Sequence, residues 1–175
     1  MDKVKLRTGV ITGLLATIAC LSYIIVVQLL GANPLAQLKY LMYTGIYALF
    51  FIGIMKYQRD NVNQYSLGAQ EGITLGITVN AVTALLTSAS LYLYLQYTSL
   101  GEKLMAMHQK DLLTLFETTK EKTIETMGED VYLQILDSVQ NIKPSDLAGD
   151  LVFGLMVAGF FHTFLFMLIF KTKSS

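Results

Sequence analysis

Four long apolar segments alternate with polar ones along the chain, and this pattern predicts four membrane-spanning helices. The predicted spans cover about residues 8–30, 35–55, 67–97 and 147–170. An α-helix rises about 1.5 Å per residue, so about 20 apolar residues cross the roughly 30 Å hydrocarbon core of a bilayer. Each segment is long enough to do so. The sequence therefore predicts an all-α integral membrane four-helix bundle, formed as a single membrane domain over residues 1–175.

The polar segment 98–146, between the third and fourth predicted spans, also has a helical pattern. Apolar residues recur at three- and four-residue spacing over 102–127, and Gly128 follows. A shorter pattern over 131–139 ends before Pro144. This spacing is typical of amphipathic helices, and glycine and proline end them. We expect an extramembranous helical hairpin inserted between two spans.

The third span carries a stripe of small or short side chains at every fourth position. Such a stripe lets another helix approach closely, which is how helices pack inside a bilayer. The stripe consists of Gly68, Gly72, Gly76, Asn80, Ala84 and Ser88. The fourth span has a comparable series, Asp150, Gly154, Ala158 and His162. We expect these two series to face each other.

Ionisable residues within or near a span are costly and are candidate functional residues. Lys39, near the start of the second span, is long enough to extend to the membrane surface. Glu71 lies in the first turns of the third span, near its cytoplasmic end, where pairing with Lys56 or Arg59 is expected. Asp150 lies in the first turns of the fourth span, where it is expected to interact with the positive end of the helix dipole.

His162 lies deeper than the other ionisable residues. It is about 17 Å along the fourth span from Leu151, which leaves about 13 Å to the opposite surface. Asn80 lies about 12 Å from that surface in the antiparallel third span. We therefore expect an interhelical hydrogen bond between Asn80 and His162. The alternative is a proton-relay or ligand-binding role, because histidine titrates near neutral pH.

The second span carries three tyrosines and is followed by a polar segment. Tyr40, Tyr43 and Tyr47 share one helical face, and the first two lie where an aromatic belt is expected at the membrane surface. Beyond the span, residues 56–61 are polar and are predicted to form a loop.

The charged residues are distributed unevenly although they sum to zero. The chain is 53% hydrophobic and only 15% charged. Segment 98–150 has five lysines and ten acidic residues. On the side of the termini, the basic residues are Lys3, Lys5, Arg7, Lys56, Arg59, Lys171 and Lys173. Because basic flanks stay in the cytoplasm, both termini are predicted to be cytoplasmic and the hairpin to lie outside. No basic surface remains for nucleic acid.

Familiar catalytic and cofactor-binding motifs are absent from the sequence. It lacks the HExxH pair, the GxxxxGK[ST] loop and the GxSxG elbow. The two histidines, His108 and His162, are predicted in different compartments. The single cysteine, Cys20, lies inside an apolar run and is expected to be a core residue. We therefore expect no catalytic, cofactor or metal site and no enzyme activity.

The stretch from Lys56 to Tyr97 carries a resemblance to a known family. It reads KYQRDNVNQYSLGAQEGITLGITVNAVTALLTSASLYLYLQY: a charged exit from the second span, a Ser-Leu-Gly-Ala-Gln entry, then a long span rich in small residues. This order resembles an uncharacterised family of small bacterial four-span inner-membrane proteins, a domain-of-unknown-function family. The resemblance extends over nearly the whole chain. It implies a location in the cytoplasmic membrane and no known activity or catalytic residues.

Two functions follow from these features. The first is a membrane protein that binds other membrane components, as an accessory subunit of another membrane protein or as a homo-oligomer within the lipid bilayer. The alternative is a small-solute or proton-linked transporter or channel formed by an oligomer, with Glu71, Asn80 and His162 lining its path.

Overall fold

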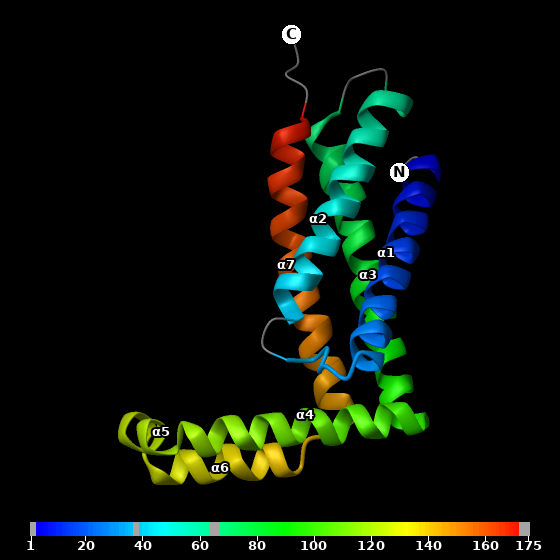
Figure 1. Cartoon of the computed structure of the whole chain (residues 1–175). Coiled ribbons are helices and arrows are strands. Elements are labelled where there is room, and N and C mark those ends of the chain that lie inside the picture. The colour runs from blue at the N-terminus through cyan, green and yellow to red at the C-terminus, as the bar shows by residue number, and fades with distance from the viewer. Residues whose placement is uncertain (1–2, 37–38, 64–66, 172–175) are drawn as a thin grey trace.

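The protein is a bundle of four long helices with a three-helix arm across one end (Figure 1). The computed structural model describes residues 3–36, 39–63 and 67–171. All four long helices are long and apolar enough to cross a membrane, which confirms the predicted fold class. The elements are α1 (Lys3–Leu29), α2 (Lys39–Tyr57), the π-helical turn η1 (Gln58–Val62), α3 (Ala69–Tyr97), α4 (Ser99–Thr118), α5 (Lys120–Met127), α6 (Glu129–Gln140) and α7 (Pro144–Phe170).

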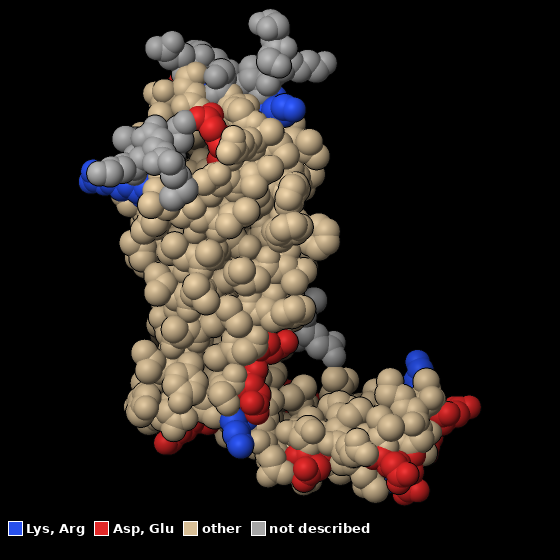
Figure 2. Space-filling view, turned by 180° about the vertical axis from the view of Figure 1, so that it is seen from behind, with Lys and Arg blue, Asp and Glu red and all other residues tan. Residues whose placement is uncertain are grey.

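The start of α1 and the end of α7 lie at one end of the bundle, and the arm formed by α4, α5 and α6 lies at the other (Figure 1). On the face shown in Figure 2, the middle of the bundle is uncharged, while charged side chains gather at its two ends and on the arm. This distribution is what a bilayer requires, because a charge within the hydrocarbon core is costly. Lys173 lies outside the described residues.

Helix α3 is the central helix of the bundle. It packs against α1 and α7, while α2 packs against α1 and α7 from the other side. It is also the most buried of the four candidate spans. Phe51, Leu91 and Leu155 are fully buried in the core that the four helices share. The contact between α3 and α7 is the most extensive in the bundle, followed by that between α1 and α3.

Two local predictions about helix boundaries differ from the structure. Residues 56–61 are not a loop, because α2 continues into η1 as far as Val62. The predicted helix over 102–127 is two helices, α4 and α5, separated at Thr119. The hydroxyls of Thr118 and Thr119 both donate to the Leu115 carbonyl, at 2.8 and 2.9 Å. Such side-chain bonds compete with the helical hydrogen bonds of the backbone and favour a break.

The tyrosines of α2 face the interior. Tyr43 and Tyr47 are each only 1% exposed, so the prediction that Tyr43 lies in an interfacial aromatic belt is wrong. Tyr43 packs edge to face against Tyr23 of α1, with ring centroids 5.5 Å apart. Only Tyr40, at the arm end of α2, reaches a polar group near the membrane boundary.

Candidate functional site

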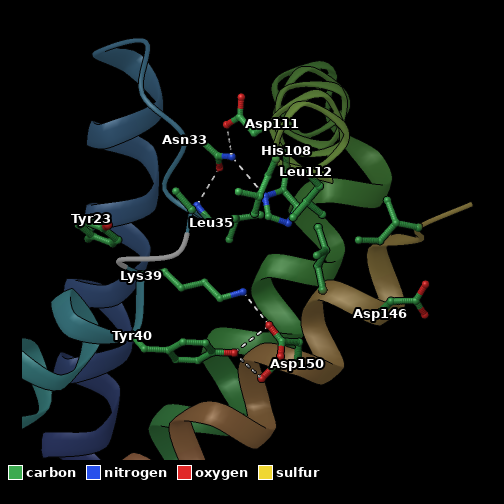
Figure 3. Close-up of a pocket in the computed structure, with 14 residues that line it drawn as sticks. Tyr23, Asn33, Leu35, Lys39, Tyr40, His108, Asp111, Leu112, Asp146 and Asp150 are labelled. Carbon is green, nitrogen blue, oxygen red and sulfur yellow. Dashed lines mark hydrogen bonds and ion pairs between the residues drawn. The ribbon is translucent and has the colours of Figure 1, made fainter. Parts of the chain in front are cut away.

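A cleft of about 970 Å³ separates the arm from the end of the bundle (Figure 3). We call it the arm cleft. Its walls come from the ends of α1, α2 and α7, from the α1–α2 connection, and from α4 and the α6–α7 connection. They are mostly apolar with a few polar groups, which is typical of small-molecule sites. The lining residues are Tyr23, Asn33, Leu35, Ala36, Lys39, Tyr40, His108, Asp111, Leu112, Leu115, Ile142, Asp146, Leu147 and Asp150.

An ion pair forms the bundle side of the arm cleft. Lys39 Nζ, in the first turn of α2, lies 2.6 Å from Asp150 Oδ2 in α7. The Tyr40 hydroxyl donates to the same carboxylate oxygen at 2.8 Å. The Lys39 side chain is 10% exposed, whereas the Asp150 side chain is 52% exposed. The carboxylate therefore holds a nearly buried ammonium group at the end of the bundle.

This pair adds a partner to one predicted residue and corrects the role of another. The ammonium group of Lys39, which is expected to extend to the membrane surface, is directed at Asp150. Asp150 does not interact chiefly with the N-terminus of its helix, which begins earlier, at Pro144. Asp146 makes the capping bond instead, since its Oδ2 accepts from the Lys143 backbone N–H at 2.9 Å.

Asn33 forms the arm side of the arm cleft and connects the α1–α2 connection to α4. Its Oδ1 accepts from the Leu35 backbone N–H at 2.9 Å, which fixes the orientation of the amide. Its Nδ2 donates to Asp111 Oδ2 at 2.8 Å and contacts His108 Nδ1 at 3.2 Å. The amide nitrogen of an asparagine side chain only donates hydrogen bonds, so Nδ1 of His108 must be the acceptor. The neutral ring then carries its proton on Nε2, and no residue in the described part of the chain accepts that proton.

His108 is buried, at 6% exposure, and its environment favours the neutral ring. Burial lowers its pKa below the ordinary value, and the positive charge of Lys39 lowers it further. The carboxylates of Asp111 and Asp150 oppose this shift of the pKa without reversing it. At neutral pH the arm cleft therefore has a neutral imidazole in its wall, with one N–H available.

The arm is attached rigidly where α3 meets α4. Gln28, at the end of α1, donates to the Leu100 carbonyl at 2.7 Å and accepts from the Tyr94 hydroxyl at 2.7 Å. Gly101 packs so closely on the last turns of α3 that a Cβ there would overlap the Tyr94 carbonyl. Within the arm, Gln109 of α4 donates to the Gln140 carbonyl of α6 at 2.6 Å. These contacts fix the position of the arm and therefore the shape of the arm cleft.

Two of the predicted candidates lie at the opposite end of the bundle. Glu71 is in the first turn of α3, and its Oε2 accepts from Asn63 Nδ2 at 2.7 Å and from the Gly68 backbone N–H at 3.3 Å. Gly68 is the N-cap residue of α3 and is exposed. It therefore does not belong to the surface that α3 presents to α7.

Gly72, Gly76 and Asn80 of the α3 stripe lie against α7. A Cβ on Gly72 would lie 3.0 Å from Met167 Cγ, and one on Gly76 would lie 2.6 Å from Thr163 Cγ2. One turn further on, Asn80 contacts Gly159, and its Nδ2 donates to the Met156 carbonyl at 3.0 Å. The two backbones therefore approach closely along this contact, which we call the α3–α7 seam.

The predicted bond between Asn80 and His162 is wrong. His162 faces α2, where its ring lies 6.2 Å from that of Tyr47 and 6.0 Å from that of Phe51. Its Nδ1 lies 2.6 Å from the Ala158 carbonyl of its own helix and donates to it. The similar depth of the two residues was not sufficient, because they lie on different faces of the bundle.

The predicted series on the fourth span likewise meets α2 and not α3. Asp150 binds Lys39 and Tyr40, and a Cβ on Gly154 would overlap the ring of Tyr40. The residues of α7 that meet α3 are offset by one position from this series: Gly159, Thr163 and Met167. A shift of one residue turns a helix by about 100°, which is enough to change its neighbour.

Sequence reasoning missed most of the arm cleft. It placed His108 on the arm but gave it no partner, and it did not single out Asn33 or Asp111. A signal was present for the ion pair, because Lys39 and Asp150 both lie in the first turns of spans that begin at the same end of the bundle. No such signal links Asn33 to residues of α4 far along the chain.

Comparison with known proteins shows a family without an assigned activity. No curated protein and no solved structure matches the chain. Among the described residues, no group of three or more His, Cys, Asp or Glu could hold a metal ion. One family matches residues 7–172, which include most of α1, all of α7 and everything between them. The chain therefore belongs to the family described as protein of unknown function (DUF4199).

Proposed function

We propose that this DUF4199 protein is a non-enzymatic membrane protein that binds another membrane component in the arm cleft. The observation that carries the proposal is the cleft itself, an apolar space of about 970 Å³ with a charged pair and an unused imidazole N–H in its walls. The absence of familiar catalytic motifs from the sequence supports binding without chemistry. Pockets of this size and composition are common binding sites in proteins.

The depth of the arm cleft supports a ligand from the membrane. Helix α7 has 27 residues and is about 40 Å long, which exceeds the roughly 30 Å hydrocarbon core by about 5 Å at each end. Asp150 lies six residues after Pro144, or about 9 Å along the helix. It is thus within one helical turn of the boundary between hydrocarbon and head groups. A molecule anchored in the bilayer can reach the cleft at this level.

Photocrosslinking tests the proposal directly. Benzoylphenylalanine in place of Leu115, which lines the arm cleft, should form an adduct in native membranes. The matched control is the same substitution at Leu133 of α6, which is 52% exposed and does not line the cleft. An adduct specific to position 115 supports the proposal. No adduct at 115, or equal adducts at both positions, would refute it.

We also propose the bacterial cytoplasmic membrane as the location, with both termini in the cytoplasm. The basic residues at the terminal end of the bundle support this orientation, and the acidic arm is then extracytoplasmic. The test uses a Cys20→Ala background, which removes the only cysteine. In intact spheroplasts, a cysteine at Thr119 should react with an impermeant reagent, and a cysteine at Ser175, outside the described residues, should not. The reverse pattern would overturn the orientation.

A second function, transport through an oligomer, is favoured by one specific observation. Several buried polar atoms of the bundle have no hydrogen-bond partner among the described residues: Tyr43 Oη, Asn80 Oδ1 and Ser88 Oγ. Buried polar groups normally find partners, and water is one of them. Mass measurement of the protein purified in mild detergent tests for the homo-oligomer. Proton flux in proteoliposomes that disappears in His162→Gln would favour transport over binding.

A further inference from the structure

We propose that the ligand of the arm cleft is a phospholipid whose head group carries a primary ammonium ion, as in phosphatidylethanolamine. This inference rests on the proposed function and names the membrane component that the cleft binds. Three properties of the cleft support it: the net charge of its lining, the hydrogen-bonding groups left unused, and the position of its apolar wall.

The charged groups that line the arm cleft at neutral pH are one cation and three carboxylates. Lys39 is the cation, and its charge is neutralised by Asp150 at 2.6 Å. Asp111 and Asp146 also line the cleft, while His108 is neutral at neutral pH. The lining is therefore net negative. Such a site attracts a head group with an ammonium ion and repels one that carries only a phosphate or another anion.

Hydrogen-bonding groups of both kinds remain unused in the arm cleft. His108 offers its Nε2–H, and Lys39 has further N–H donors beyond the one directed at Asp150. Asp150 Oδ1 accepts from no described residue, and half of this side chain is exposed. A phosphate can accept from the imidazole and the lysine, while an ammonium group can donate to the carboxylate. A zwitterionic head group satisfies both sets of groups at once.

The apolar part of the wall fits the glycerol and the first methylene groups of such a lipid. It consists of Leu35, Leu112, Leu115, Ile142 and Leu147. The volume of about 970 Å³ lies in the range of sites for drug-sized groups, which a head group with its glycerol resembles in size. The chains would therefore remain in the bilayer beside the bundle, where the surface is uncharged (Figure 2).

The test uses the full chain in nanodiscs of phosphatidylcholine that contain equal amounts of phosphatidylethanolamine and phosphatidylglycerol. The protein is released into mild detergent, and the bound lipids are identified by native mass spectrometry. We expect phosphatidylethanolamine to exceed phosphatidylglycerol by at least about threefold at low salt, because one or two partly exposed charges contribute about that factor. Salt should reduce the preference, because it screens exposed charges.

Two variants test separately the charge of the arm cleft's lining and the room inside the arm cleft. The double change Asp111→Asn with Asp146→Asn removes two negative charges, yet each asparagine keeps an oxygen to accept the bonds from Asn33 and the Lys143 backbone. The lipid should still bind, but with little preference between the two head groups. Leu115→Trp adds bulk to the apolar wall of the cleft and should weaken binding of both lipids, whereas the control Leu133→Trp should leave binding and the native preference unchanged.

The possible failures can be distinguished. Equal binding of the two lipids by the native chain, or a preference for phosphatidylglycerol, would overturn the choice of head group. A native preference left unchanged in the Asp111→Asn, Asp146→Asn variant would also contradict it. A protein adduct at the benzoylphenylalanine placed at Leu115, without a lipid adduct, would refute the lipid while leaving the proposed function intact. No adduct at all would refute both.

Discussion

The α3–α7 seam and the arm cleft are held together in opposite ways. At the α3–α7 seam two backbones are in close contact, so that even a Cβ on Gly76 would lie 2.6 Å from Thr163 Cγ2. At the arm cleft the helices diverge, and polar contacts such as Lys39 with Asp150 and Asn33 with Asp111 span the space. Packing specifies the first region, and electrostatics and hydrogen bonds specify the second.

This difference separates scaffold from candidate site within one small protein. Inside a bilayer, apolar surface gives helices no preference for each other over lipid, so close packing must supply the association. Near the membrane boundary, water is available and polar groups cost less. An open space with unused donors can therefore be tolerated there, and it would be costly in the α3–α7 seam. Substitutions should accordingly act through volume in one region and through charge in the other.

The largest effect is expected from added volume in the α3–α7 seam. Gly76→Leu places a branched side chain against Thr163, which is fully buried and cannot move aside. We expect the bundle to lose more than about 3 kcal/mol or to fail to fold, at the upper end of overpacking effects. The free energy of unfolding, followed by circular dichroism during titration with a denaturing detergent, measures this.

The matched control is the same substitution at Gly45 of α2. Apart from the adjoining backbone of its own helix, no described atom lies within 4 Å of a Cβ at that position. Gly45→Leu should be neutral or stabilising by about 0.5 to 1 kcal/mol, because leucine is the better helix former. Equal losses at the two positions would mean that the α3–α7 seam is not a close contact.

The next effect concerns the ion pair of the arm cleft and should be asymmetric. Asp150→Asn leaves the ammonium group of Lys39 unpaired while its side chain is only 10% exposed. Removing one partner of a buried pair costs about 3 to 5 kcal/mol, and we expect about 2 to 4 here because Asp150 itself is half exposed. Lys39→Met leaves a carboxylate that water can solvate, so it should cost about 1 kcal/mol or less.

Thermal unfolding of the two single variants and of the double variant checks this asymmetry. Lys39→Met combined with Asp150→Asn should be more stable than Asp150→Asn alone, since the unpaired cation is gone. If Lys39→Met proved the more harmful change, the burial of Lys39 would not be what makes the pair necessary.

The sequence was sufficient to predict the fold but not which faces of the helices meet. Each span is a continuous apolar run, and length alone identifies it. The pairing of α7 with its neighbours depends on rotation about the helix axis, which an apolar run does not encode. The series from Asp150 to His162 was therefore assigned to α3, although Asp150 and His162 face α2.

The arm cleft was less predictable because its contacts join residues that are distant in the sequence. Asn33 contacts Asp111 and His108 only because α4 turns back across the end of the bundle. That turn depends on Thr98, which leaves the helical conformation, and on the close approach of Gly101 to α3. Neither residue type is unusual at a helix start, so the sequence alone does not indicate the direction of the arm.

A third, smaller effect is expected at this attachment of the arm. Gly101→Ala places a methyl group against the Tyr94 carbonyl, and a backbone atom cannot yield as a side chain can. We expect a loss of about 1 to 3 kcal/mol, concentrated in the arm. Limited trypsin digestion should cut the lysines of α4 and α5 faster than in the native chain. The control Gly149→Ala, where nothing lies within 4 Å, should leave the digestion unchanged; equal digestion of both variants would contradict the effect.

The smallest expected effect is a pH dependence that belongs to the arm cleft and not to the α3–α7 seam. His108 has a lowered pKa in the folded protein, so the unfolded chain binds its proton more readily. The stability that the neutral ring contributes is complete above about pH 6.5, the ordinary value, and is lost as pH falls below it toward the folded pKa. Protonation also places a hydrogen on Nδ1, opposite the Asn33 amide that already donates there. Asn33 cannot turn to accept it without losing its bonds to Leu35 and Asp111.

The protein should therefore unfold at a lower temperature at pH 5 than at pH 7. The corresponding loss in the free energy of unfolding is at most about 1.4 kcal/mol for each unit by which the folded and unfolded pKa values of His108 differ. His108→Gln retains an acceptor and a donor but cannot titrate, so it should remove most of this slope while keeping the arm in place. Lys39, Asp111 and Asp150 are the charged groups that face the ring. If the slope persisted in His108→Gln, the pH dependence would belong to another group and not to the imidazole of the arm cleft.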